Sequence, residues 1–293
     1  MATHYRGSPL GIKLIIFLYN TFGYKAAKAL VYVVAFFYAL VSQKNRKVLS
    51  SYYDAVELPQ NFSTYFKHVY AFSLTIFDRF IAKENMQEKS IKIERINVEN
   101  FETLQKTGGI LVLSHHGNWA QSFKIFQSYD IKLNIIGAEA IDTNLQKLET
   151  DKEENNRIHI IDLKSGMQAM LEIARALQNK EVIIIMVDRV KEEDKTVSVS
   201  FLERATYLHS GGFEIAHMRK TPMLGCDIVR TGDNAIKVEF SKIITTQEKK
   251  KEARISDLAQ QYASFLERVV KAYPYQWFNF FDFWEKRPEE KSL

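Results

Sequence analysis

The chain has 293 residues, 46% of them hydrophobic and 26% charged, a composition that excludes a disordered chain and fits one large globular domain or a core with a small appended element. Its single cysteine, Cys226, excludes an intramolecular disulfide and a Cys-x-x-Cys metal site, and indicates a reducing compartment. The net charge of +5 favours anionic partners, but the basic residues are scattered and no nucleic-acid-binding signature is present, so nucleic acid is not expected as a partner.

The amino-terminal stretch, residues 10–41, is apolar and aromatic with interspersed basic residues. Its longest uncharged apolar run, residues 29–41, has 13 residues, whereas a helix needs about 20 to cross a bilayer core. This length argues against a transmembrane span, and the absence of a small-residue cleavage pattern argues against a secretory signal. The basic residues that flank and interrupt the apolar segments are Arg6, Lys13, Lys25, Lys28, Lys44, Arg46 and Lys47.

This combination is typical of a helix or helical hairpin that lies in the interface of an anionic membrane. Residues 31–38 are apolar on every helical face, and a soluble domain would have to cover all of them. An ordinary buried helix pair stays the alternative. Residues 62–83 continue the helical and aromatic character. We expect residues 1–95 to form a membrane-associating helical segment packed on the core.

Four short runs rich in Ile and Val follow, at residues 109–115, 133–139, 157–163 and 182–188. They are typical of strands buried on both faces. A helical segment over 165–180 has an apolar stripe at helical spacing, which we interpret as core: Met167, Met170, Leu171, Ala174 and Leu177.

Further strands are predicted at 196–202, 222–230 and 235–244, with a short helix over 210–220 and a long amphipathic helix after residue 250. Strands that alternate with helices predict an α/β fold, with a mostly parallel central sheet flanked by helices. We expect it to span residues 96–293, most simply as one continuous domain.

In parallel α/β sheets the ligand binds beyond the carboxyl ends of the strands. His115 follows one predicted strand and Asp188 follows another, so both are placed at such ends. A histidine there can take a proton near neutral pH, provided that a carboxylate fixes its tautomer. A polar turn made by His115 and His116 stays the alternative. Neighbouring histidines point apart and no carboxylate pair completes a set, so no metal is expected.

The segment SHHGNW resembles the first block of the lysophospholipid acyltransferase superfamily, in particular its bacterial branch of late acyltransferases of lipid A synthesis. That block is a histidine, four residues, then Asp or Glu, commonly with Gly-Asn-Trp in the gap. Residues 187–224 are similar to a later segment of the family, and residues 273–284 resemble its carboxyl-terminal Gln-Trp block. The matching positions are His115, Gly117, Asn118, Trp119, Asp188, Arg189, Phe201 and Arg204.

The resemblance implies acyl transfer from acyl carrier protein or acyl-CoA to a hydroxyl or amine of a membrane lipid or glycolipid acceptor, with no metal or redox cofactor. It implies His115 as general base, and it makes Arg204 and Arg189 candidates for phosphate binding, since a guanidinium can make two charge-assisted hydrogen bonds to a phosphate. Asn118 and Trp119 are further candidates for substrate binding. Asp188 is included with them, with positioning of its loop as its expected role. The enzyme would work at the cytoplasmic face of a bacterial inner membrane, as a peripheral or monotopic protein on an anionic surface.

The chain departs from the family pattern at position 120, where the expected carboxylate is replaced by Ala120. Gln121 does not substitute, because one helical step turns its side chain about 100° away. Three explanations stay open: an inactivated variant, a non-catalytic lipid- or carrier-binding protein of the same fold, or an orienting group from elsewhere in the fold. We predict that the chain acylates about 10²- to 10⁴-fold more slowly than its Ala120→Glu variant.

Overall fold

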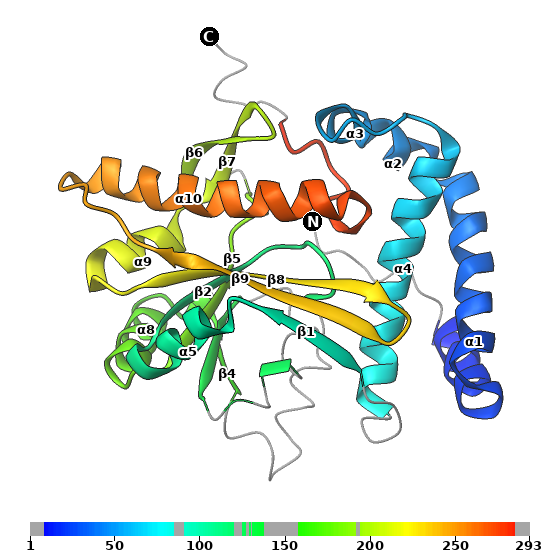
Figure 1. Cartoon of the computed structure of the whole chain (residues 1–293), viewed down its shortest axis with the longest axis horizontal. Helices are drawn as coiled ribbons and strands as arrows, with labels where there is room; N and C mark the ends of the chain where they lie inside the picture. The colour runs from blue at the N-terminus through cyan, green and yellow to red at the C-terminus, as the bar shows by residue number, and fades with distance from the viewer. Residues whose placement is uncertain are drawn as a thin grey trace. The chain divides into compact units, whose positions relative to one another are not determined.

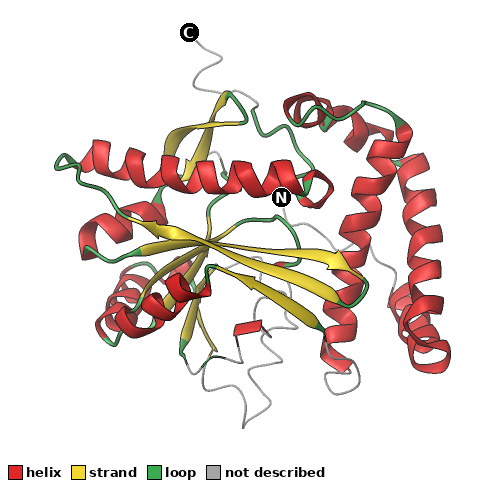
Figure 2. Ribbon diagram, in the orientation of Figure 1, coloured by secondary structure: helices red, strands yellow, loops and turns green. Residues whose placement is uncertain are grey.

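The computed structural model describes residues 9–84, 91–119, 125–126, 129, 131–137, 158–191 and 194–284. Contacts divide the chain into two compact units, Met1–Ser90 with Phe280–Asp282, and Ile91–Asn279 with Phe283–Leu293. The described part of the first unit is helical, whereas the second combines strands and helices (Figure 2). The division predicted from the sequence, into residues 1–95 and 96–293, stays a prediction.

The first unit is built from α1 (Pro9–Val41), α2 (Gln43–Val48), α3 (Ser50–Ala55) and α4 (Phe62–Glu84). Helix α1 bends at Gly23, whose φ of 79° is in a region that glycine adopts without strain. Helices α1 and α4 pack antiparallel through their aromatic rings: Tyr24 lies 5.6 Å from Phe77 near one end, and Phe36 lies 5.7 Å from Phe62 near the other. Residues 10–41, expected to form a helix or a helical hairpin, are therefore one bent helix, and its partner is α4, where helical character was expected over residues 62–83.

The two faces of α1 differ in the size of their side chains. Ala27, Val31, Ala35 and Ala39, spaced four residues apart, are buried. By length and composition, Lys13–Val41 is a stretch of described helix that could cross a membrane. It is longer than the uncharged run of residues 29–41 because the helix also includes Lys25 and Lys28. The helix is a candidate membrane-binding segment. The exposed large apolar side chains of α1 are Leu14, Phe17, Phe22, Tyr32, Val33, Val34, Phe37, Tyr38, Leu40 and Val41.

The second unit contains a sheet of seven described strands, in the order β1-β9-β8-β2-β5-β3-β4 (Figure 1). Neighbouring strands are parallel except β8 and β9, which form an antiparallel hairpin. The predicted fold class, a mostly parallel central sheet flanked by helices, is confirmed. The strands are β1 (Lys92–Ile96), β2 (Gly109–Leu113), β3 (Leu133–Ile136), β4 (Ile158–Ile161), β5 (Val182–Met186), β8 (Met223–Gly232) and β9 (Ala235–Ile244).

Helices cover both faces of this sheet. On one face, α5 (Val98–Thr107) packs Phe101 and Leu104 into the same core as Leu111 and Leu113 of β2. The opposite face is covered by α9 (Gly211–Arg219) and α10 (Lys251–Ala272), which lie across the sheet from α5 in Figure 1. Strands β2 and β5 have almost only apolar residues because both of their faces are buried.

Helix α8 (Met167–Gln178) overturns one sequence-based prediction. The stripe of Met167, Met170 and Leu171 was expected in the core, but Met167 is 77% exposed and the other two are more than 40% exposed. The buried face consists of Ala169, Ile173 and Ala176. Ala174 and Leu177, which the prediction placed in the same stripe, are half-buried. The helix therefore packs through a face centred on smaller side chains, and the prediction was wrong for Met167, Met170 and Leu171.

A separate antiparallel hairpin of β6 (Thr196–Phe201) and β7 (Arg204–His209) precedes α9. Strand β6 was expected from the sequence, but β7 was not. The 3-10 turns η2 (Leu163–Ser165) and η3 (Pro274–Gln276) precede α8 and follow α10. The chain after η3 returns to the end of β2, where the candidate site lies.

Candidate active site

His115 and Asp188 follow two neighbouring parallel strands. Strands β2 and β5 pair with Leu113 opposite Met186, and each functional side chain comes two residues later. The register therefore continues past the strand ends and brings the two residues face to face. Because side chains alternate along an extended chain, the spacing of two also gives them the same side as the last paired residues.

The Asp188 carboxylate contacts both the imidazole and the backbone N–H of His115. Oδ1 lies 2.9 Å from the imidazole Nδ1, and Oδ2 accepts the backbone N–H of His115 at 2.9 Å and the Asn279 Nδ2–H at 2.8 Å. Burial opposes the charge of Asp188, but the imidazole of His115, the charge of Arg189 and the His115 N–H outweigh it and lower the pKa of Asp188 to about 2. Asp188 is thus a carboxylate at neutral pH.

A carboxylate can only accept hydrogen bonds, so Nδ1 of His115 carries a proton. The neutral ring then has its lone pair on Nε2. Among the described residues Nε2 has no hydrogen-bond partner, and 7% of the side chain is exposed. The ring of Trp119 lies edge-on to the imidazole, with 5.5 Å between ring centroids. This arrangement is that of a general base with a fixed tautomer.

The loop that carries His115 is held by hydrogen bonds of its backbone. Phe278 donates its N–H to the His115 carbonyl at 2.8 Å, and the Gly117 N–H donates to the Gln276 carbonyl at 2.7 Å. A β-bridge joins His116 to Trp277 between them. Gly117 has a φ of 65°, and a Cβ there would lie 2.0 Å from the Ile228 carbonyl oxygen, so only glycine fits. Segment 276–278 therefore fixes the loop at 115–117.

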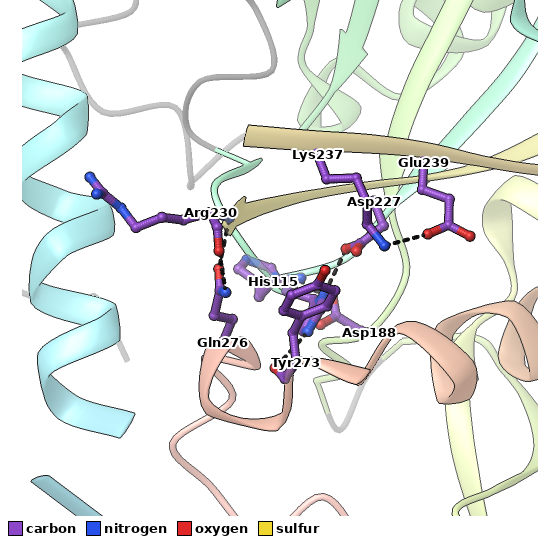
Figure 3. A network of polar contacts seen from close by, with 9 residues as sticks. His115, Asp188, Asp227, Arg230, Lys237, Glu239, Tyr273 and Gln276 are labelled. Carbon is purple, nitrogen blue, oxygen red and sulfur yellow. Dashed lines mark hydrogen bonds and ion pairs between the residues drawn. The ribbon is translucent and has the colours of Figure 1, made fainter. Parts of the chain in front are cut away.

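A second histidine–aspartate pair lies beside the first. His116 Nδ1 is 2.7 Å from Asp227 Oδ1, and His116 Nε2 is 3.1 Å from the carbonyl oxygen of Tyr273 (Figure 3). Both side chains are almost completely buried. The alternative interpretation of His115 and His116 as a polar turn is wrong, because both side chains are buried against carboxylates.

Residues 273–276, which lead into the segment that fixes the loop at 115–117, also contact β8 and β9. Gln276 donates to the carbonyl of Arg230 and accepts from its N–H, at 2.9 and 3.0 Å (Figure 3). Lys237 lies 4.8 Å from the centroid of the Tyr273 ring and pairs with Glu239 at 2.9 Å. Residues 273–279 are therefore held by β8 and β9 as well as by the loop that carries the two histidines.

The two arginines proposed for phosphate binding, Arg189 and Arg204, lie in different surroundings. Arg189 is an exposed residue, but its guanidinium donates from Nε to the Asn279 Oδ1 at 3.0 Å and from a terminal nitrogen to the Phe278 carbonyl at 3.0 Å. Arg204, on β7, has its guanidinium carbon 5.2 Å from the centroid of the Trp284 ring. Asn118 is buried and donates its backbone N–H to the Ile228 carbonyl. The structure therefore brings His115, Trp119, Asp188 and Arg189 together, and places Arg204 against Trp284.

Two other buried titratable groups near the site stay protonated. Burial and the charge of Asp188 raise the pKa of the Tyr262 phenol, which α10 supplies. Burial and the charge of Asp227 raise the pKa of the Cys226 thiol. Since a thiol is a nucleophile only as a thiolate, Cys226 behaves as a buried apolar side chain.

Two residues of the site were missed in the sequence. Asp227 had a usable signal, since a carboxylate inside the apolar run of β8 needs a buried partner. Asn279 had no local signal, because its partner Asp188 is 91 residues away. Ala120, the position of the missing family carboxylate, lies outside the described residues.

Comparison with known protein families adds independent information. The family model described as bacterial lipid A biosynthesis acyltransferase matches residues 64–286 of the chain. Among curated proteins, none matches it. The matched range includes every residue of both histidine–aspartate pairs.

Proposed function

The chain belongs to the bacterial lipid A biosynthesis acyltransferase family, and we propose that it transfers a fatty acyl chain from an acyl thioester to a hydroxyl or amine of a membrane lipid or glycolipid. The donor is acyl carrier protein or acyl-CoA. The observation that carries this proposal is the buried His115–Asp188 pair, whose geometry leaves Nε2 of His115 as a base.

In the proposed reaction, Nε2 of His115 takes the proton of the acceptor O–H or N–H as that atom attacks the thioester carbonyl. A tetrahedral intermediate forms, its C–S bond breaks, and the departing thiolate takes the proton from the imidazolium. Asp188 stays ionised throughout, holds the Nδ1–H and stabilises the transient positive charge of the ring. Asp188 is thus proposed to orient the base rather than only its loop.

This role for Asp188 bears on the alanine at position 120. Of the three explanations for Ala120, an orienting group from elsewhere in the fold is supported by the 2.9 Å contact between Asp188 and His115. The chain as it stands is then proposed to be active. Arg204, Asn118 and Trp119 are retained as candidates for substrate binding, whereas two of the three nitrogens of Arg189 are already used by Asn279 and Phe278.

We place the enzyme at the cytoplasmic face of a bacterial inner membrane, as a peripheral or monotopic protein. The support is the exposed apolar face of α1 together with the positive net charge, which suits anionic lipids. Phe37→Asp should lower co-flotation with vesicles that contain phosphatidylglycerol. Met167→Asp, which changes an exposed apolar residue on α8, is the matched control. Equal loss in both variants would contradict the role of α1.

The function is tested with acyl carrier protein that bears a labelled acyl chain, a bacterial lipid extract, and mass spectrometry of the lipids. The unchanged chain and the Ala120→Glu variant are assayed side by side. If Asp188 supplies the orientation, the unchanged chain forms a new acylated lipid and Ala120→Glu gains less than about tenfold. A gain of 10² or more would mean that the chain is a disabled form.

The alternative function is non-catalytic binding of lipid or carrier protein, and the observation that favours it is Ala120 itself. It predicts that neither protein acylates any lipid while both retain lipid on purification. A new acylated lipid from the unchanged chain would exclude it.

A further inference from the structure

Asn279 is a buried amide between two charged groups of the site. Its Nδ2–H donates to Asp188 Oδ2 at 2.8 Å, and its Oδ1 accepts from Arg189 Nε at 3.0 Å. Only 2% of the residue is exposed. A carboxylate can only accept and a guanidinium can only donate, so the amide has a single orientation that satisfies both partners.

Arg189 also donates to the carbonyl of Phe278, the residue before Asn279. The guanidinium therefore holds both the backbone and the side chain of this short segment. Phe278 in turn donates its N–H to the His115 carbonyl. The hydrogen bonds form a closed circuit that runs from His115 through Asp188, Asn279 and Arg189 and returns by Phe278.

These hydrogen bonds matter because the carboxylate of an aspartate can rotate about its terminal torsion. The terminal torsion of an aspartate is broad, so a single contact does not hold its plane. In Asp188, the Oδ2 atom is held by the His115 N–H and by Asn279, which directs Oδ1 at the imidazole. Without Asn279, one of the two bonds that hold Oδ2 is lost and the carboxylate can turn away from Nδ1.

We propose that Asn279, oriented by Arg189, is a positioning residue that holds the Asp188 carboxylate in the plane in which it fixes the tautomer of His115. The inference deepens the proposed function and rests on it for its catalytic consequence. The positioning itself is a statement about the resting protein and can be tested without any substrate.

The test uses the full chain with ¹⁵N-labelled histidine, and follows the downfield Nδ1–H proton signals of His115 and His116 by NMR. His115→Gln assigns the first signal. We expect Asn279→Leu, which has a similar volume but no donor, to shift or broaden the His115 signal. The His116 signal, held by Asp227, should stay in place and shows that the fold is intact.

A matched control is Asn134→Leu. Asn134 is also a buried asparagine whose Nδ2–H donates to a carboxylate, Glu181 Oε2 at 2.9 Å, but it lies on β3. It should leave both histidine signals unchanged. If Asn279→Leu loses the His116 signal, the smaller Asn279→Ala replaces it as the deciding variant. A His115 signal that stays unmoved in the variant that keeps its fold would overturn the proposal.

The same variants are assayed for acyl transfer from labelled acyl carrier protein. We expect Asn279→Leu to lower kcat about 10- to 100-fold with little change in KM, because it disturbs the base and not the binding of the acceptor. An equal fall for Asn134→Leu would mean a general loss of structure. If the unchanged chain transfers nothing, the proposed function fails, while the NMR signals still decide whether Asn279 positions Asp188.

Discussion

The regions around His115 and His116 each contain a buried histidine–aspartate pair, but one pair is a candidate for catalysis and the other is structural. In each, a buried histidine binds a buried aspartate through Nδ1, at 2.9 Å for Asp188 and 2.7 Å for Asp227. The difference is the second nitrogen. Nε2 of His116 bonds the carbonyl of Tyr273, whereas Nε2 of His115 has no partner among the described residues. A histidine–aspartate pair is therefore a candidate base only where the second ring nitrogen of the histidine is left available.

The neighbouring positions explain the difference. Successive side chains of an extended segment point to opposite sides, so two adjacent histidines reach different aspartates from different strands. His116 is directed at β8 and at the end of α10, where both of its nitrogens meet acceptors. With Asp227 as a carboxylate, both nitrogens donate and the ring has no lone pair to offer. His116 is thus a structural residue, whose two ring nitrogens are both used within the protein.

The largest expected effect separates the two histidines by activity. His115→Gln should lower acyl transfer about 10³- to 10⁴-fold, because the proton acceptor is lost. It should also lower Tm, since the buried Asp188 loses its imidazole partner. His116→Gln should lower Tm, since Asp227 loses a charged partner, and should lower transfer only as far as the fold is lost. Transfer rates and thermal unfolding of both variants check this. Equal losses of activity at equal Tm would remove the distinction.

Asp188→Asn sharpens the comparison at the carboxylates. An amide in this place can present its NH₂ group to Nδ1, which favours the wrong tautomer of His115, and we expect about a 10²- to 10³-fold lower kcat. Steady-state kinetics with labelled acyl carrier protein measures it. Retention of more than a tenth of the activity would show that Asp188 only holds its loop, as the sequence alone suggested.

Asp227→Asn should act on stability. Removal of one partner of a buried ion pair leaves the other charge unpaired, at a cost of about 3–5 kcal/mol. The free energy of unfolding in urea checks this value. A loss below about 1 kcal/mol would mean that the imidazole of His116 is neutral in the folded protein.

The smallest expected effect is the acid stability of the Asp188 pair. Its pKa is about 2 in the folded chain against an ordinary 3.8, so the folded state favours the ionised form. The corresponding stabilisation, about 2.5 kcal/mol, is complete above about pH 4 and is lost as the pH falls toward about 2. Urea unfolding over this range should show the decline in the unchanged chain. An Asp188→Asn variant with the same decline would assign it to other carboxyl groups.

The fold was predictable where local patterns report burial. The Ile- and Val-rich runs became β2 to β5, and β2, β3 and β5 are buried on both faces, which favours apolar side chains. The expectation of two buried faces was wrong for β4, which is the edge strand and exposes His159. The same reasoning failed for α8, where Met167, Met170 and Leu171 are apolar but exposed and the core accepts the smaller stripe. Periodicity identifies a helix, but it does not decide which of two apolar faces is packed.

The order of residues along the chain was enough to predict that His115 and Asp188 follow buried strands, that the chain is an α/β protein, and that its blocks resemble an acyltransferase family. The pairing of β2 with β5 in register, which makes Asp188 the partner of His115, became visible in the three-dimensional structure and had no signal in the sequence. The same holds for the hydrogen bond of Asn279 to Asp188 and for the pair of His116 with Asp227. The reason is physical: hydrophobic patterns report the local burial of a segment, whereas the order of strands and the partners of buried polar groups depend on contacts between distant segments.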